Sequence, residues 1–166
     1  MRDIERVLHS LLSRLAEMSI PFLQVSGIEF REKAAVEFSF DLSVPPCILC
    51  GPFQDKDREV VSIAHEAGHV TVFRNMRREA ARDYLCTMFA AHGVGLGGIS
   101  PKGQECILNV EARASAIGRS MLEEIDIKNH DLKTVAALMS QWYTTYETLC
   151  RQNVVNKVRG RLLKDL

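Results

Sequence analysis

Residues 60 to 73 read "VVSIAHEAGHVTVF", an almost wholly apolar run that contains two histidines and a glutamate. Polar side chains in such a run are costly to bury unless they gain partners. The pattern is His65-Glu66-x-x-His69, and its spacing has a geometric consequence. Residues four apart on an α-helix lie on one face, about 6 Å apart along the axis. In a strand the same pair would be separated by about 13 Å.

We predict a helix over residues 57–76, although the β-branched residues of this segment favour a strand. Apolar residues occupy every side of the helical wheel, which is typical of a helix buried in the core. The run is also too long for an ordinary strand. Asp55 or Asp57 is the expected N-cap. Two imidazoles one turn apart can then bind one zinc ion at about 2.1 Å each.

Glu66 follows the first histidine directly, about 100° further round the helix. It would lie beside the metal without being a ligand. A carboxylate in that place can take a proton from a water molecule that the ion acidifies, and later pass it to a leaving amine. Glu66 is therefore the predicted catalytic base. Gly68 has no side chain, which allows a neighbouring element or a substrate to approach this helix closely.

A catalytic zinc site normally has three protein ligands and a water molecule. The extended pattern H-E-x-x-H-x-x-G-x-x-H is excluded, because Val72 and Asn75 stand where it needs Gly and His. A carboxylate from a later helix is the next option, and Glu111 lies on the apolar face of "NVEARASAIGRSML". A glutamate in such a place needs a partner, so it is the preferred third ligand. Weaker candidates are His92, Glu105, His130, Glu124, Glu79 and Asp83.

The stretch "AHEAGH", followed by "VEARASAIGRSML", resembles the ImmA/IrrE-type zinc metallopeptidases. In that family a helix with A-H-E-x-G-H precedes one that reads E-x-x-A, whose glutamate completes the metal site. The similarity covers roughly residues 55–125. It implies a minimal zincin-like domain with Zn²⁺ bound by His65, His69 and Glu111, and with Glu66 as general base.

The second helix departs from the family pattern, which usually ends in Leu-Met-Pro, because here Leu122 leads into two glutamates. Members of the family often cut one regulatory protein, frequently a repressor. The resemblance therefore implies a protein or peptide substrate such as a transcriptional regulator.

The rest of the chain predicts an α+β fold in a single domain over residues 1–166. Periodic apolar residues indicate an amphipathic helix over residues 3–18, closed by Pro21. Residues 22–50, including "GIEF", "AAVEFSFDLSV" and "CILC", are rich in β-branched and aromatic residues and predict two or three antiparallel strands. The further helices are expected over residues 78–91, from a cap at Asn109 to about 125, and over residues 131–150.

Two short motifs are given ordinary interpretations. Cys47-x-x-Cys50 has neither a second cysteine pair nor a strand-to-helix setting, so we expect plain strand cysteines. The glycines of "HGVGLGGISPKG" fit G-x-G-x-x-G but follow a predicted helix, so we expect a mobile loop beside the metal and no nucleotide site. The donor that would stabilise an oxyanion stays open among Tyr84, Tyr143, Tyr146 and His92.

Composition bounds the function further. Twenty-one basic residues balance 21 acidic ones among 166. The net charge therefore creates no electrostatic attraction to nucleic acid or to an anionic membrane. The chain has no membrane-length apolar run or signal-like start, and its cysteine count is odd, which together predict a cytoplasmic protein. The leading hypothesis is a zinc metallopeptidase. The alternative is an inactive or weakly active, metal-stabilised interaction protein that binds a regulator.

Overall fold

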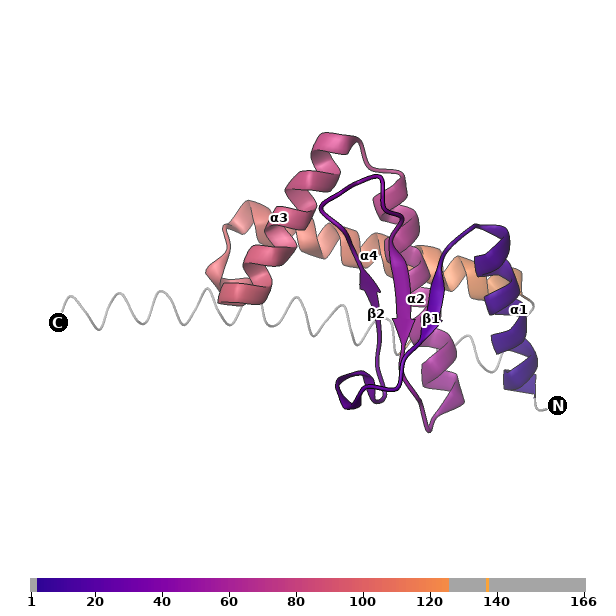
Figure 1. Ribbon diagram of the computed structural model, residues 1–166. Coiled ribbons are helices and arrows are strands. Elements are labelled where there is room, and N and C mark those ends of the chain that lie inside the picture. Colours follow the sequence, from indigo (N-terminus) through magenta and orange to yellow (C-terminus); the bar gives the residue numbers. More distant parts are fainter. Residues whose placement is uncertain (1–2, 126–136, 138–166) are drawn as a thin grey trace, which may run out of the picture.

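The computed structural model describes residues 3–125 and Ala137. Its α+β class confirms the prediction (Figure 1). The predicted helix over residues 131–150 lies outside the described residues, apart from Ala137. The elements in chain order are α1 (Asp3–Glu17), β1 (Phe22–Gln24), the 3₁₀ turn η1 (Ile28–Phe30), β2 (Ala34–Glu37), β3 (Cys47–Cys50), α2 (Lys56–Arg74), α3 (Arg78–Val94), the 3₁₀ turn η2 (Leu96–Gly98) and α4 (Pro101–Glu124).

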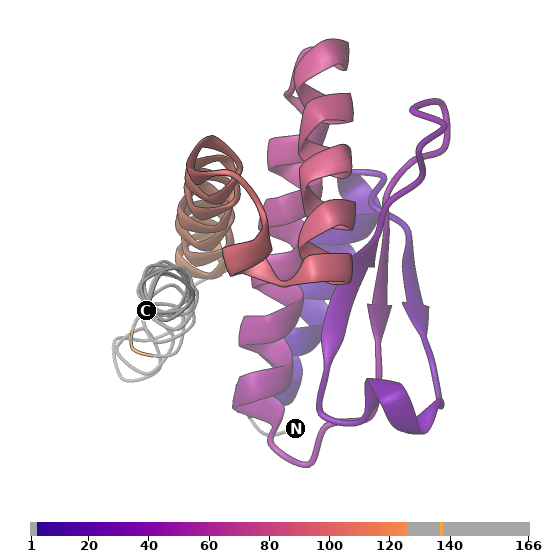
Figure 2. The same ribbon diagram turned by 90° about the vertical axis from the view of Figure 1, so that its left-hand side faces the viewer.

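Helix α2 lies between the sheet on one side and α4 on the other (Figure 2). This position explains its composition, because a helix that is covered all round must be apolar all round. Val60, Val61 and Ile63 are buried, and so are both histidines of the motif. Helix α1 packs against α2 through its own apolar stripe, with Leu11 and Leu15 fully buried. The predicted buried helix is therefore confirmed.

The three-stranded sheet is mixed, with the order β1-β3-β2. Strand β1 pairs parallel to β3, whereas β2 pairs antiparallel to it. The expectation of a purely antiparallel sheet was therefore wrong. The most apolar strand takes the central place, where Ile48 and Cys50 are fully buried. The segment "GIEF", expected to be a strand, forms η1 instead and carries the chain from one edge of the sheet to the other.

Helix α4 begins earlier than predicted. The hydroxyl of Ser100 accepts a hydrogen bond from the amide of Gly103, and Pro101 is the first residue of the helix. Serine at the N-cap followed by proline is a strong start signal, because proline lacks the amide hydrogen that has no partner there anyway. The predicted cap at Asn109 was wrong, and Glu111 lies well inside the helix.

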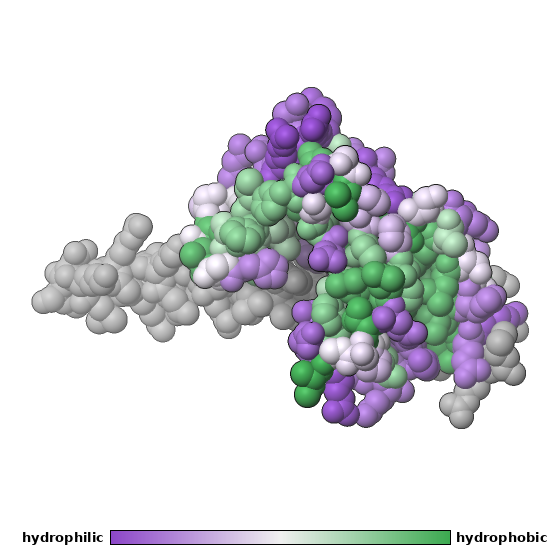
Figure 3. All heavy atoms as spheres, in the orientation of Figure 1, coloured by the Kyte–Doolittle hydropathy of each residue, from purple (hydrophilic) through white to green (hydrophobic). Residues whose placement is uncertain are grey.

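The described core has two parts that share α2. One joins α1, the sheet, α2 and the last turns of α4. The other joins α2, α3 and α4, with Phe38 against Phe73 and Tyr84. On the face shown in Figure 3, hydrophobic residues gather over the strands, and Leu23 of β1 is 57% exposed. Among the described residues, helices thus cover one face of the sheet only. No helix in the described part of the chain has the length and apolar character needed to cross a membrane.

Candidate metal centre

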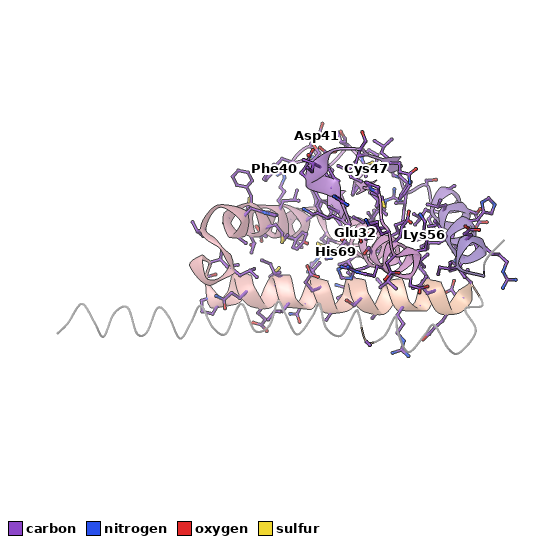
Figure 4. The ribbon with its side chains drawn as sticks, turned by 90° about the horizontal axis from the view of Figure 1, so that it is seen from below. Glu32, Phe40, Asp41, Cys47, Lys56 and His69 are labelled. Carbon is purple, nitrogen blue, oxygen red and sulfur yellow. The ribbon has the colours of Figure 1, made fainter. Side chains whose placement is uncertain are left out.

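His65 and His69 lie one turn apart on α2, as the sequence predicts. The helix is anchored at its start by Asp55, whose carboxylate accepts hydrogen bonds from the amides of Asp57 and Arg58. The two imidazole rings meet edge to face, and their Nε2 atoms are 3.1 Å apart. Both side chains are buried. In Figure 4, His69 lies between α2 and α4.

Glu111 of α4 completes the group. Its Oε2 atom lies 3.3 Å from Nε2 of His65 and 3.4 Å from Nε2 of His69, and its side chain is buried. The structure thus brings the preferred third ligand to the two histidines. The described alternatives are all exposed and outside the group: His92, Glu105, Glu124, Glu79 and Asp83. His130 is not among the described residues.

Small residues at the crossing of α2 and α4 bring Glu111 within reach. A Cβ atom at Gly68 would lie 2.0 Å from the carbonyl oxygen of Ala114, and one at Gly118 would lie 2.5 Å from that of Ala64. Each helix therefore carries an alanine and a glycine four residues apart at the contact. Because the backbones touch, the short distance between the helices can be spanned by side chains from both. The close approach expected at Gly68 is confirmed, with α4 as the neighbour.

The three ligand atoms cannot all be joined by hydrogen bonds. Each Nε2 carries either a hydrogen or a lone pair, so at most two of the three contacts among His65, His69 and Glu111 can be hydrogen bonds. A cation at their centre would accept a lone pair from each of the three atoms. Their separations of 3.1, 3.3 and 3.4 Å match the edge of about 3.4 Å expected for a tetrahedral zinc site with bonds of about 2.1 Å. The buried group can hold a metal ion.

The remaining ring nitrogens of the two histidines differ. Nδ1 of His65 lies 3.2 Å from Oγ of Ser115, on the turn of α4 that follows Glu111. Nδ1 of His69 is buried and has no hydrogen-bond partner among the described residues. Sequence reasoning missed Ser115. The signal was present, because a residue four positions after Glu111 shares its helix face.

Two carboxylates of the centre have opposite pKa shifts. Burial raises the pKa of Glu111, but hydrogen bonds from His65 and His69 and their charges outweigh it and bring the pKa down to about 2. Burial raises the pKa of Glu66 to about 7, and the nearby charge of Glu111 acts in the same direction. The charges of His65 and Lys33 and a backbone hydrogen bond counter part of this rise. Glu111 is thus a ready cation ligand, whereas Glu66 titrates near neutrality.

Glu66 lies beside the metal-binding group and is not part of it. Its carboxylate accepts a hydrogen bond from the backbone amide of Val36 in β2. Strand β2 is an edge strand, and the carbonyl of Lys33 accepts from the amide of Gly51 next to β3. In this antiparallel register the backbone groups of Ala34 and Val36 point away from β3. Among the described residues no strand pairs with this edge of the sheet, which borders the candidate base.

The weaker sequence motifs take ordinary places in the structure. Cys47 and Cys50 lie in β3, and burial raises the pKa of both thiols, that of Cys50 to about 11, so neither is a reactive thiolate at neutral pH. The glycine-rich segment runs from the last turn of α3 through η2 into the first turn of α4, and it follows a helix, not a strand. Tyr84 is buried against Phe38 and Phe73. The oxyanion donor stays a prediction.

No family model, curated protein or solved structure matches the chain. The resemblance to ImmA/IrrE-type peptidases therefore rests on the two short motifs alone. What the described residues establish by themselves is a buried group of two imidazoles and a carboxylate, drawn from two crossing helices, that can hold a metal ion.

Proposed function

We propose that this protein is a zinc-dependent metallopeptidase with a minimal zincin-like fold. His65, His69 and Glu111 would hold the ion, and Glu66 would be the general base. The observation that carries the proposal is the buried triangle of ligand atoms, whose three contacts no arrangement of protons can satisfy. Two imidazoles and a carboxylate are a common donor set for a catalytic zinc site that keeps one position open.

A bound zinc ion would polarise the carbonyl of the scissile peptide bond and acidify a water molecule. Glu66 would take a proton from the attacking water and deliver it to the departing amine. A base works best when its pKa is close to the working pH. Burial raises the pKa of Glu66 to about 7 in the metal-free chain, and the positive charge of a bound zinc ion would lower it. The amide of Val36 fixes one oxygen of this carboxylate and so supports its orientation.

The edge of β2 suggests the form of the substrate. The amide and carbonyl of Ala34 and the carbonyl of Val36 point outward along this edge, while the amide of Val36 is hydrogen-bonded to Glu66. An extended peptide can pair with such an edge through main-chain hydrogen bonds. The scissile bond would then pass beside Glu66. We propose an extended segment of a regulatory protein as the substrate. The four free cysteines among the described residues agree with a cytoplasmic setting.

The test uses purified full-length protein, elemental analysis and a quenched-fluorescent peptide library. The wild type and Glu66→Gln are expected to carry one zinc per chain, and His65→Ala none. Only the wild type should cleave, since removing a general base typically lowers the rate by about 10²- to 10⁴-fold. Equal cleavage by Glu66→Gln, or a wild type that binds no metal, would contradict the proposal. Zinc binding with a stable, uncut protein partner would favour the interaction protein instead.

A further inference from the structure

We propose that Ser115 is a positioning residue for this metal centre. Its hydroxyl accepts a hydrogen bond from Nδ1–H of His65 and thereby keeps the lone pair of Nε2 directed at the ion. The inference rests on the proposed function, because it assumes that His65 binds a metal. It names a residue that neither the H-E-x-x-H pattern nor the third-ligand motif includes.

The contact comes from a different helix than the histidine. Oγ of Ser115 on α4 lies 3.2 Å from Nδ1 of His65 on α2, within hydrogen-bonding range. Nε2 of the same ring lies 3.3 Å from Oε2 of Glu111. The two nitrogens of the ring therefore face two residues one turn apart on α4.

The protons decide the direction of the hydrogen bond. A neutral imidazole has one N–H and one lone pair, and a metal takes the lone pair. When Nε2 of His65 binds the ion, Nδ1 must carry the hydrogen and needs an acceptor. A serine hydroxyl can accept this hydrogen bond and still donate its own hydrogen elsewhere. Such outer contacts set the tautomer of metal-binding histidines and strengthen their binding.

The second histidine has no equivalent support in the described part of the chain. Nδ1 of His69 is buried without a hydrogen-bond partner among those residues. Ser115 therefore contacts the outer nitrogen of His65, whereas the outer nitrogen of His69 has no such contact among the described residues. We therefore expect that removing the hydroxyl of Ser115 lowers the affinity for the metal.

The helix crossing explains why so short a side chain can reach. Ser115 follows Ala114, whose carbonyl oxygen occupies the place that a Cβ atom at Gly68 would take. With the backbones in contact there, a hydroxyl on a single carbon spans the gap to the imidazole. Ser115 is partly buried, whereas Ser120, one turn and a little further along α4, is exposed and offers a matched control.

The experiment compares the wild type, Ser115→Ala, Ser115→Thr and Ser120→Ala as full-length proteins. Zinc affinity is measured by competition with a chromophoric chelator, and Co²⁺ is used to record the visible absorption spectrum of the centre. Thermal unfolding is followed in the metal-free state. Ser115→Ala is expected to bind zinc about 10- to 100-fold more weakly and to shift the Co²⁺ bands. Ser115→Thr should restore most of the affinity, and Ser120→Ala should match the wild type.

A structural role alone would give a different pattern. Metal-free Ser115→Ala is expected to unfold only slightly below metal-free Ser120→Ala, because one hydrogen bond is lost, whereas the zinc-loaded proteins should differ more. The inference is overturned if Ser115→Ala binds zinc within about twofold of the wild type, or if Ser115→Thr binds as weakly as Ser115→Ala. It is also overturned if the loss of affinity accompanies a matching loss of metal-free stability. A wild type that binds no zinc would instead refute the proposed function itself.

Discussion

The two sides of α2 are built on different principles. Toward α1 and the sheet, large apolar side chains such as Leu11, Ile48 and Ile63 fill the space and are fully buried. Toward α4, the helix carries Ala64 and Gly68, and the two backbones touch. The first side gains its stability from buried apolar area. The second side has little area to bury at the crossing and contains the polar group instead.

This difference separates stability from site geometry. A packed apolar face tolerates small shifts, because side chains can readjust at modest cost. A backbone contact between two helices cannot readjust without moving the helices themselves. His65, His69 and Glu111 depend on that contact, since they come from both helices. We expect the apolar side to control stability and the side facing α4 to control metal binding.

The largest expected effect is that of the metal. Free zinc at about a thousandfold above its Kd should raise the free energy of unfolding by about 4 kcal/mol, because only the folded chain assembles the three ligands. His69→Ala should abolish this increase. Chemical denaturation with and without zinc, at fixed pH, measures both values. Equal stability of the wild type in the two conditions would show that the site binds no zinc.

Leu11→Ala tests the apolar side of α2, which faces α1 and the sheet. The side chain is fully buried between α1 and the core, so its truncation should cost about 2–5 kcal/mol of unfolding free energy. The increase due to zinc should stay the same as in the wild type, since Leu11 lies away from the crossing with α4. Denaturation curves of the metal-free and zinc-loaded variant give both numbers. A reduced zinc increment would mean that the two sides are coupled.

Gly68→Ala tests the side of α2 that faces α4. The new Cβ atom would lie 2.0 Å from the carbonyl oxygen of Ala114, so the helices must separate. We expect a net loss of about 2 kcal/mol, from overpacking offset in part by higher helix propensity. The increment due to zinc should largely disappear as well. Gly93→Ala in α3 is the control, because nothing lies within 4 Å of its Cβ atom, and it should be neutral or slightly stabilising.

Glu66→Gln is expected to change stability in the opposite direction from Leu11→Ala and Gly68→Ala, because it should stabilise the metal-free protein. The pKa of Glu66 rises from 4.5 to about 7 on folding, so the folded chain binds the proton more tightly. Its stabilising contribution is present below pH 4.5 and is lost as the pH rises through 7. The metal-free variant should therefore be more stable than the wild type above pH 7, where the wild-type carboxylate is ionised in the folded chain. Chemical denaturation of both metal-free proteins at pH 5 and at pH 8 measures this difference. If the two proteins differ in unfolding free energy by the same amount at both pH values, the prediction is wrong.

The helix that carries the motif was predictable because its evidence is local. Asp55, the apolar run and its length identify α2 without reference to any other part of the chain. The start of α4 was equally local but was obscured by the glycines before it, which favoured a loop over the cap at Ser100. The sheet order was not predictable, because the partner of β1 depends on which strand best fills the centre.

The composition of the site divides in the same way. The sequence by itself determined that His65 and His69 share a helix face, because the helical repeat fixes the relation of residues four apart. Only the tertiary structure decided that Glu111 and Ser115 meet them, since those residues lie on another helix. That meeting depends on the crossing angle and spacing of α2 and α4. These are set by the absence of side-chain atoms at Gly68 and Gly118, an effect that appears only when the two surfaces are brought together.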